Sequence, residues 1–169
     1  KAIALDPGFA MAHRTIAWAY MYIFDLKKSE EHMQKAFDLT LVQRDRISER
    51  EYFLIQADYF GMTRNTWDKS IESYQRLLEV YPDDLLGRLN LGDKFFALED
   101  WDKAIECFQS LTKYKDNIWS FRRLEWIYSV LGDYDKQWEM IEEWKKNTPD
   151  DPEINDAEAG YYRNLRDFD

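Results

Sequence analysis

The feature that most constrains this chain is a motif that returns at a nearly constant spacing. A bulky residue, a polar pair and a small or polar residue open an apolar stripe at Trp67, Trp101 and Tyr134, with a weaker copy at Leu26 and an incomplete one at 167–169. The leading residues at positions 26, 67, 101, 134 and 168 lie 41, 34, 33 and 34 positions apart. The prolines at 7, 82 and 149 keep the same phase. A period of about 20–50 residues indicates a repeat protein.

Each period predicts two amphipathic helices. In the third period apolar residues recur at spacings of three and four over 85–98 and again over 101–113, with a polar break between them. The fourth period predicts helices over 119–131 and 134–146. Gly132 lies between them and suits the left-handed position that follows a helix end.

The second period carries recognisable helix-start residues. Ser48 and Glu51 form a predicted capping box, which starts a helix that runs to about Met62. Thr66 is the expected N-cap of the next helix, over 67–80. The first period is longer than the others, and we place its extra residues, about seven, within 40–48.

Two such helices joined by a short turn form an antiparallel hairpin, and one hairpin cannot bury both of its apolar stripes. Neighbouring hairpins must therefore stack. The predicted fold class is all-α, an α-solenoid of stacked antiparallel helix hairpins.

Certain positions recur in successive periods, in the third Leu91, Gly92, Phe95, Ala104 and Phe108, and in the fourth Phe121, Leu124, Tyr128 and Pro149. These positions resemble the tetratricopeptide-repeat (TPR) family, and the resemblance extends over essentially the whole chain. It implies a right-handed, TPR-like superhelix. Three positions depart from the pattern, because Asp58, Glu125 and Gln137 stand where a small residue is usual. They predict looser packing or local polar contacts.

We interpret 1–169 as a single TPR domain cut from a longer solenoid or multidomain protein. The segment 45–51 resembles repeat regions attached to bacterial signalling proteins. The expected divisions are the end of a preceding repeat at 1–9, repeat 1 with its insertion at 10–50, repeat 2 at 51–84, repeat 3 at 85–117, repeat 4 at 118–151, and the first helix of a further repeat at 152–169.

Composition excludes several classes of protein. The net charge of −10 argues against a nucleic-acid partner, which needs a clustered positive surface. No apolar run is long enough for membrane insertion. One cysteine excludes an internal disulfide and a cysteine zinc cluster. No secretory signal opens the sequence, so we expect a cytoplasmic protein.

The sequence contains no recognisable catalytic constellation. His13 and His32 are expected on different helices, at the surface or in a groove, and show no zinc-binding spacing. Cys107 is expected to be a buried, inert thiol. The acid pairs 83–84 and 150–151 are best explained as helix-start residues. We therefore expect no enzyme activity, no cofactor and no metal site.

The family resemblance implies that the first helix of each hairpin lines a concave groove. Core packing or a solvated helix face are the alternatives for these positions. Some family members bind a peptide's C-terminal carboxylate with a clamp of polar and basic residues, and only Asn90 and Arg123 match it here. The predicted ligand is instead a peptide with apolar anchors and some acidic character. The predicted groove residues are Arg14, Trp18, Tyr22, Tyr52, Gln56, Tyr59, Asn90, Asp93, Trp119, Arg122, Arg123 and Trp126.

These observations predict a non-catalytic scaffold for protein–protein interaction that binds a partner peptide in the groove. Aromatic and arginine side chains are frequent anchors of such interfaces. The alternatives are a self-associating structural module of a larger signalling protein, with homo-oligomers, and binding of carbohydrate or another small ligand.

Overall fold

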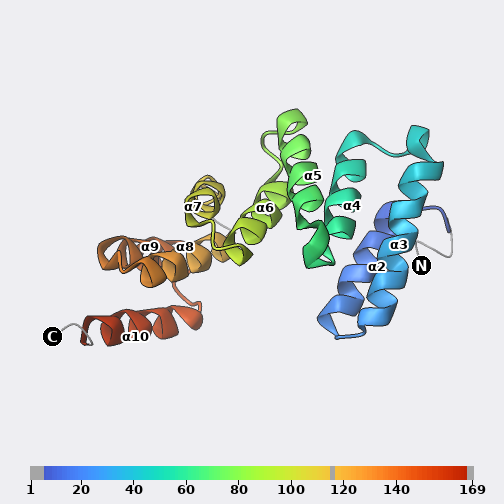
Figure 1. Ribbon diagram of the computed structural model, residues 1–169. Coiled ribbons are helices and arrows are strands. Elements are labelled where there is room, and N and C mark those ends of the chain that lie inside the picture. The colour runs from blue at the N-terminus through green and yellow to red at the C-terminus, as the bar shows by residue number, and fades with distance from the viewer. Residues whose placement is uncertain (1–5, 115–116, 167–169) are drawn as a thin grey trace. The chain divides into compact units, whose positions relative to one another are not determined.

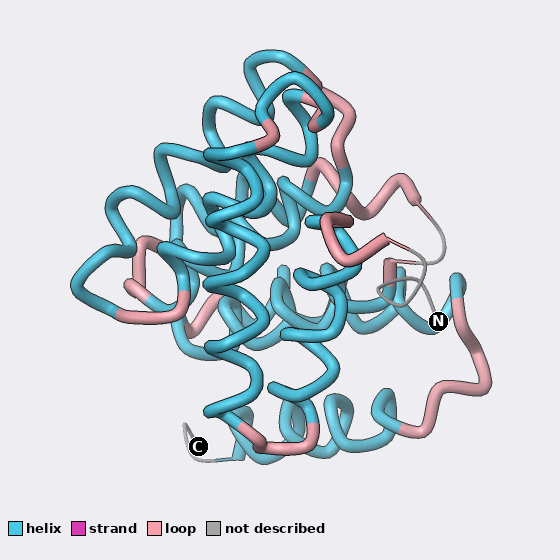
Figure 2. Tube along the Cα trace, turned by 90° about the vertical axis from the view of Figure 1, so that its right-hand side faces the viewer, coloured by secondary structure: helices cyan, strands magenta, loops and turns pink. Residues whose placement is uncertain are grey.

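The computed structural model describes residues 6–114 and 117–166. Within these residues the chain forms nine α-helices, two short 3-10 helices and no strand, so the predicted all-α class is confirmed (Figures 1 and 2). The expected preceding helix end at 1–5 and the incomplete motif at 167–169 lie outside the described residues. The helices are α2 (Ala10–Tyr22), α3 (Leu26–Val42), α4 (Glu49–Gly61), α5 (Trp67–Val80), α6 (Leu85–Ala97), α7 (Trp101–Gln109), α8 (Ile118–Leu131), α9 (Tyr134–Asn147) and α10 (Glu153–Arg166), with 3-10 helices at Arg44–Arg46 and Arg64–Thr66.

The chain divides into two compact units, Lys1–Gly87 and Arg88–Asp169, which we call unit 1 and unit 2. In unit 1, α2 pairs with α3 and α4 pairs with α5, and α3 also packs on α4. A core cluster of Ala10, Ala36 and Ile55 joins the two hairpins. The small alanines allow these helices to approach closely.

In unit 2, α8 pairs with α9, and α10 packs on α9. The buried cluster of Phe121, Ile141, Trp144 and Ile154 joins these three helices. Helix α6 approaches α7 at Gly92, where an added Cβ would lie 2.8 Å from a ring carbon of Phe108. This contact therefore requires the absence of a side chain at position 92.

Several helix ends follow the predicted chemistry. The Ser48–Glu51 capping box is present with both of its hydrogen bonds. Gly132 adopts the left-handed conformation with φ 70°. Thr66 does not cap α5 as predicted, because its hydroxyl donates to the Phe60 carbonyl at the end of α4 instead. A 3-10 turn precedes α5 and takes the position that the cap was expected to fill.

Two turns that carry no glycine use the same left-handed geometry. Phe24 and Glu99 both have φ 59°. In each turn the next backbone N–H donates to a carbonyl in the last turn of the preceding helix, Asp25 to Tyr20 and Asp100 to Phe95, both at 3.0 Å. This is the Schellman arrangement, in which a non-glycine residue is strained by about 1–2 kcal/mol.

No helix of the described residues is long and apolar enough to cross a lipid bilayer.

Candidate functional site

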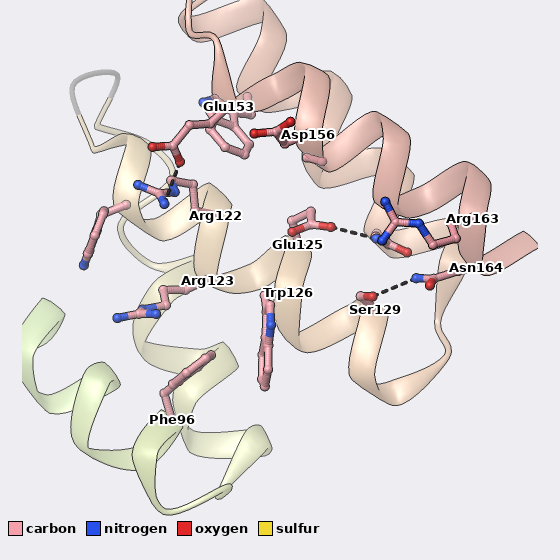
Figure 3. Close-up of a pocket in the computed structure, with 15 residues that line it drawn as sticks. Phe96, Arg122, Arg123, Glu125, Trp126, Ser129, Glu153, Asp156, Arg163 and Asn164 are labelled. Carbon is pink, nitrogen blue, oxygen red and sulfur yellow. Dashed lines mark hydrogen bonds and ion pairs between the residues drawn. The ribbon is translucent and has the colours of Figure 1, made fainter.

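One candidate site is a groove of about 850 Å³ in unit 2, formed by α8, α9 and α10 with Phe96 of α6 (Figure 3). We call it the α8–α10 groove. Its aromatic residues are Phe96, Trp119, Trp126 and Trp144; its charged residues are Arg122, Arg123, Arg163, Glu125, Glu153 and Asp156; the remaining lining residues are Ser129, Gln137, Ala157, Gly160 and Asn164.

Helical spacing explains which side chains meet in this groove. On α8 the lining residues recur every three or four positions, so they share one helix face. The lining residues of α10 lie 34 positions after those of α8, with Gly160 corresponding to Trp126 and Glu153 to Trp119. An added Cβ at Gly160 would meet no atom within 4 Å. The groove is therefore open on the side opposite Trp126.

Arginines and aromatic rings stack along the α6 side of the groove. The Arg123 guanidinium lies 4.5 Å from the ring centre of Phe96 and 5.2 Å from that of Trp119, and Arg122 lies 4.6 Å from Trp119. Phe96 also packs on Trp126, with 4.8 Å between ring centres. Trp119 and Trp126 nevertheless stay 42% and 45% exposed. Both indoles therefore keep a large apolar surface in contact with solvent.

Both of these arginines have carboxylate partners within the unit. Arg123 Nε lies 2.8 Å from Asp93, and an Arg122 guanidinium nitrogen lies 2.6 Å from Glu153. Burial raises the pKa of Asp93, and the charge of Arg123 and hydrogen bonds from Arg123 and Trp119 oppose this effect. The positive charges of α8 are thus balanced before any ligand arrives.

The floor of the groove holds Glu125 and Gln137, two of the three positions that depart from the family pattern. Gln137 is fully buried, and its Nε2 donates to Glu125 Oε1 at 2.7 Å. Its Oε1 accepts no hydrogen bond. Burial raises the pKa of Glu125, and the bond from Gln137 opposes this only in part. The prediction of local polar contacts at these positions is confirmed.

The third departure, Asp58, is the centre of a buried network in unit 1. Asp58 lies 2.7 Å from Arg14 Nε, accepts from Trp18 Nε1 at 2.6 Å, and accepts from the Tyr74 hydroxyl. Arg14 is 8% exposed and Asp58 4%. The alternative of a solvated helix face is wrong for Arg14, because the carboxylate on α4 draws it into the interior.

The remaining predicted groove residues lie in different places. Tyr52 and Gln56 line a smaller recess of about 430 Å³ in unit 1, between α4 and α5. Tyr59 stacks on Phe37 with 4.1 Å between ring centres. Tyr22 is exposed at the end of α2. Asn90 and Asp93 are half-buried on α6, and of the twelve predicted residues only Trp119, Arg122, Arg123 and Trp126 line the α8–α10 groove.

Sequence reasoning missed the groove residues that α10 contributes, and it did not place Glu125 and Gln137 in a site. The signal was available in both cases. Shifting the α8 positions by one period of 34 residues finds Glu153, Asp156 and Arg163, and the pattern departures mark the floor.

The histidines and the cysteine lie outside this groove. His13 is buried, and its Nδ1 lies 3.0 Å from that of His32 on the adjacent helix. Of the two expected locations, surface or groove, the surface is therefore wrong for His13. Cys107 is buried as predicted, and burial raises the pKa of its thiol to about 11. Among residues 6–114 and 117–166, no three His, Cys, Asp or Glu side chains group as metal ligands.

Comparison with known proteins identifies the fold. Residues 51–84 match the family model of the tetratricopeptide repeat. The solved structure of MamA AMB-1 has 16% identity, covers 92% of this chain and 82% of its own, and gives a TM-score of 0.64. A Podosopora anserina putative kinesin light chain with nearly identical TPR-like repeats gives 12% identity, coverage of 95% and 87%, and a TM-score of 0.70. YrrB, a TPR protein, has 17% identity, covers 94% of this chain and 96% of its own, and gives a TM-score of 0.51. No curated protein sequence matches the chain.

These findings confirm the resemblance read from the repeated positions. The protein has the helix-hairpin fold of TPR solenoids, and the family model recognises its second repeat directly.

Proposed function

We propose that this chain is a non-catalytic module for protein–protein interaction, and that it binds a segment of a partner in the α8–α10 groove. The observation that carries the proposal is the pair of tryptophans on one face of α8. Trp119 and Trp126 are both nearly half exposed beside an open groove. Exposed aromatic rings next to arginines are the usual anchors of protein interfaces.

The area of these rings indicates how much affinity they can supply. A tryptophan side chain buries about 150–250 Å² when it is fully covered, so the exposed part of each ring is on the order of 100 Å². At about 25 cal/mol per Å², covering each ring contributes roughly 2 kcal/mol. The groove, at about 850 Å³, accommodates a short peptide segment.

The fold supports the same proposal. YrrB, one of the structural relatives, is a TPR protein with an unusual peptide-binding site. The groove is lined by residues of α6, α8 and α10, which are the expected first helices of successive repeats, together with residues of α9, and this supports the proposal.

The test is a selection of peptides from a random twelve-residue display library against the whole chain. The affinity of the selected peptides is then measured by calorimetry for Trp119→Ala combined with Trp126→Ala. We expect a loss of 100-fold or more, about 3 kcal/mol, with an unchanged helical circular dichroism spectrum. Trp18 is left in place because its indole is bonded to the buried Asp58.

The matched control removes two exposed aromatic rings elsewhere, Tyr22→Ala at the end of α2 with Phe24→Ala in the turn that follows. This variant should keep full affinity. If the control loses binding and the double tryptophan variant keeps it, the groove is not the binding site.

Self-association is a second candidate, and one observation favours it. The turn between α2 and α3 and the two helix ends beside it expose four large apolar side chains within five positions, Tyr22, Ile23, Phe24 and Leu26. Patches of this kind often mark contacts between proteins. Light scattering over a range of concentrations tests the idea, since Ile23→Ser with Phe24→Ser should lower the measured mass if this turn joins two copies.

A further inference from the structure

We infer that the α8–α10 groove selects a basic partner segment, and that a lysine or arginine side chain of that segment reaches Glu125 and Gln137 at the groove floor. The inference rests on the proposed function, because it specifies the chemistry of the ligand that the same groove would bind.

The ion pairs of the groove argue against the acidic ligand that the sequence suggested. Arg122 is paired with Glu153 at 2.6 Å and Arg123 with Asp93 at 2.8 Å. An acidic side chain would have to displace one of these carboxylates, which are already held in place by the fold. Exchanging one carboxylate for another gains little free energy.

The floor of the groove has acceptors that lack donors. Gln137 is fully buried, lines the groove, and has an Oε1 atom without a hydrogen bond. A buried acceptor of this kind destabilises the free protein. Glu125 accepts from Gln137, and within the described residues it makes no ion pair. A lysine ammonium group carries three donors and could supply both residues at once.

The groove residues beside Glu125 and Gln137 suit both the methylene groups and the charge of a basic side chain. Trp126 is 45% exposed, and an indole face attracts a cation while its ring packs on the methylene groups. Gly160 leaves open space on the α10 side. Asp156 lines the same groove, as Figure 3 shows. The net charge of −10 also attracts basic segments over longer distances.

Other charged groups line the groove near Glu125 and Gln137. Arg122 and Arg123 of α8 line the same groove, as do Glu153, Asp156 and Arg163 of α10. The groups that shift the pKa of Glu125 include neither Arg163 nor any other cation. Within residues 6–114 and 117–166, Glu125 forms no ion pair, and its hydrogen-bond partner is Gln137.

The experiment uses three capped pentapeptides that differ only in the central residue. Each has leucine at both ends and alanine on either side of lysine, norleucine or glutamate. They are titrated into the whole chain up to the millimolar range, and binding is followed by the indole NMR signal of Trp126. We expect the lysine peptide to bind at least tenfold more tightly than the norleucine peptide, and the glutamate peptide to bind most weakly.

Two charge-matched variants identify the floor. Glu125→Gln keeps an oxygen that can accept from Gln137 and should reduce the lysine preference to less than about twofold. Glu139→Gln removes the same charge from an exposed site on α9 outside the groove and should keep the tenfold preference. Long-range attraction by the net charge cannot explain this difference, because both variants change the net charge equally.

The pH dependence gives an independent readout. Burial raises the pKa of Glu125 in the free chain, and a bound cation would lower it, so affinity for the lysine peptide should increase as pH rises through the free-chain pKa. The Glu125→Gln variant should lose this dependence.

The outcomes separate this inference from the proposed function. If the three peptides bind alike and shift Trp126, the groove binds peptides but the lysine preference is wrong. If the glutamate peptide binds best, the inference is overturned in favour of an acidic ligand. If none shifts Trp126, both the inference and the proposed groove fail.

Discussion

One substitution, glycine to alanine, should change the stability of unit 2 in opposite directions at two helical sites. Gly92 lies in α6 and Gly160 in α10. An added Cβ at Gly92 would lie 2.8 Å from a ring carbon of Phe108 and 3.0 Å from the Cβ of Cys107. At Gly160 the same atom would meet nothing within 4 Å. The chemical change is identical, and only the surroundings differ.

The magnitudes follow from two opposing effects. Alanine is favoured over glycine in a helix interior by about 1 kcal/mol. Gly160→Ala should keep this whole gain and raise the melting temperature by roughly 2–4 °C. At Gly92 the gain is opposed by overpacking against the fully buried Phe108 ring, which costs about 1–3 kcal/mol. Gly92→Ala should therefore be destabilising, by up to about 2 kcal/mol.

Urea unfolding followed by circular dichroism measures both variants on the whole chain. Gly132→Ala is a useful control, because it places a side chain at φ 70° without any steric contact and should destabilise through backbone strain alone. If Gly92→Ala stabilised the chain as much as Gly160→Ala, the close approach of α6 and α7 at Gly92 would be refuted.

Three further changes test other parts of the structure. Phe24→Gly should stabilise the chain by about 0.5–1 kcal/mol, because it relieves a left-handed φ of 59° at a side chain that is 87% exposed, and a higher urea midpoint would show this. Asp58→Ala should cost about 3–5 kcal/mol because it leaves Arg14 charged and buried, whereas Asp58→Leu with Arg14→Met should recover much of the loss in the same assay. Glu125→Gln should raise the melting temperature more at about pH 8 than at about pH 4, because the raised pKa of this acid means that its contribution to stability is present at low pH and is lost as pH rises. Equal shifts at both pH values would show that Glu125 is not desolvated.

The sequence predicted the helices well because their positions depend on local signals. Apolar spacing placed a helix over 67–80, which is α5 as observed, and the capping box at Ser48 and the glycine at 132 fixed two helix ends. Thr66 was misassigned because its hydroxyl has a competing acceptor, the Phe60 carbonyl, that only the folded hairpin brings within reach.

The candidate site was predicted less completely because it depends on contacts between helices. Arg14 could be assigned to a surface or a groove from its position on the helix, but its partner Asp58 lies on a different hairpin. Gln137 and Glu125 come from the two helices of one hairpin, α9 and α8, and the sequence alone did not show that their side chains meet. Asp58, Glu125 and Gln137 stand where a small residue is usual, and this departure indicated a polar contact. The sequence did not indicate which residue would be the partner.

The exposed faces of Trp119 and Trp126 are the proposed contact surface for a partner segment. The most direct measurement is a crystal structure of the chain with the tightest peptide from the display library. We expect a peptide that covers both indoles and lies between α8 and α10. A peptide bound instead in the recess of unit 1, or on the turn between α2 and α3, with both indoles left uncovered, would contradict it.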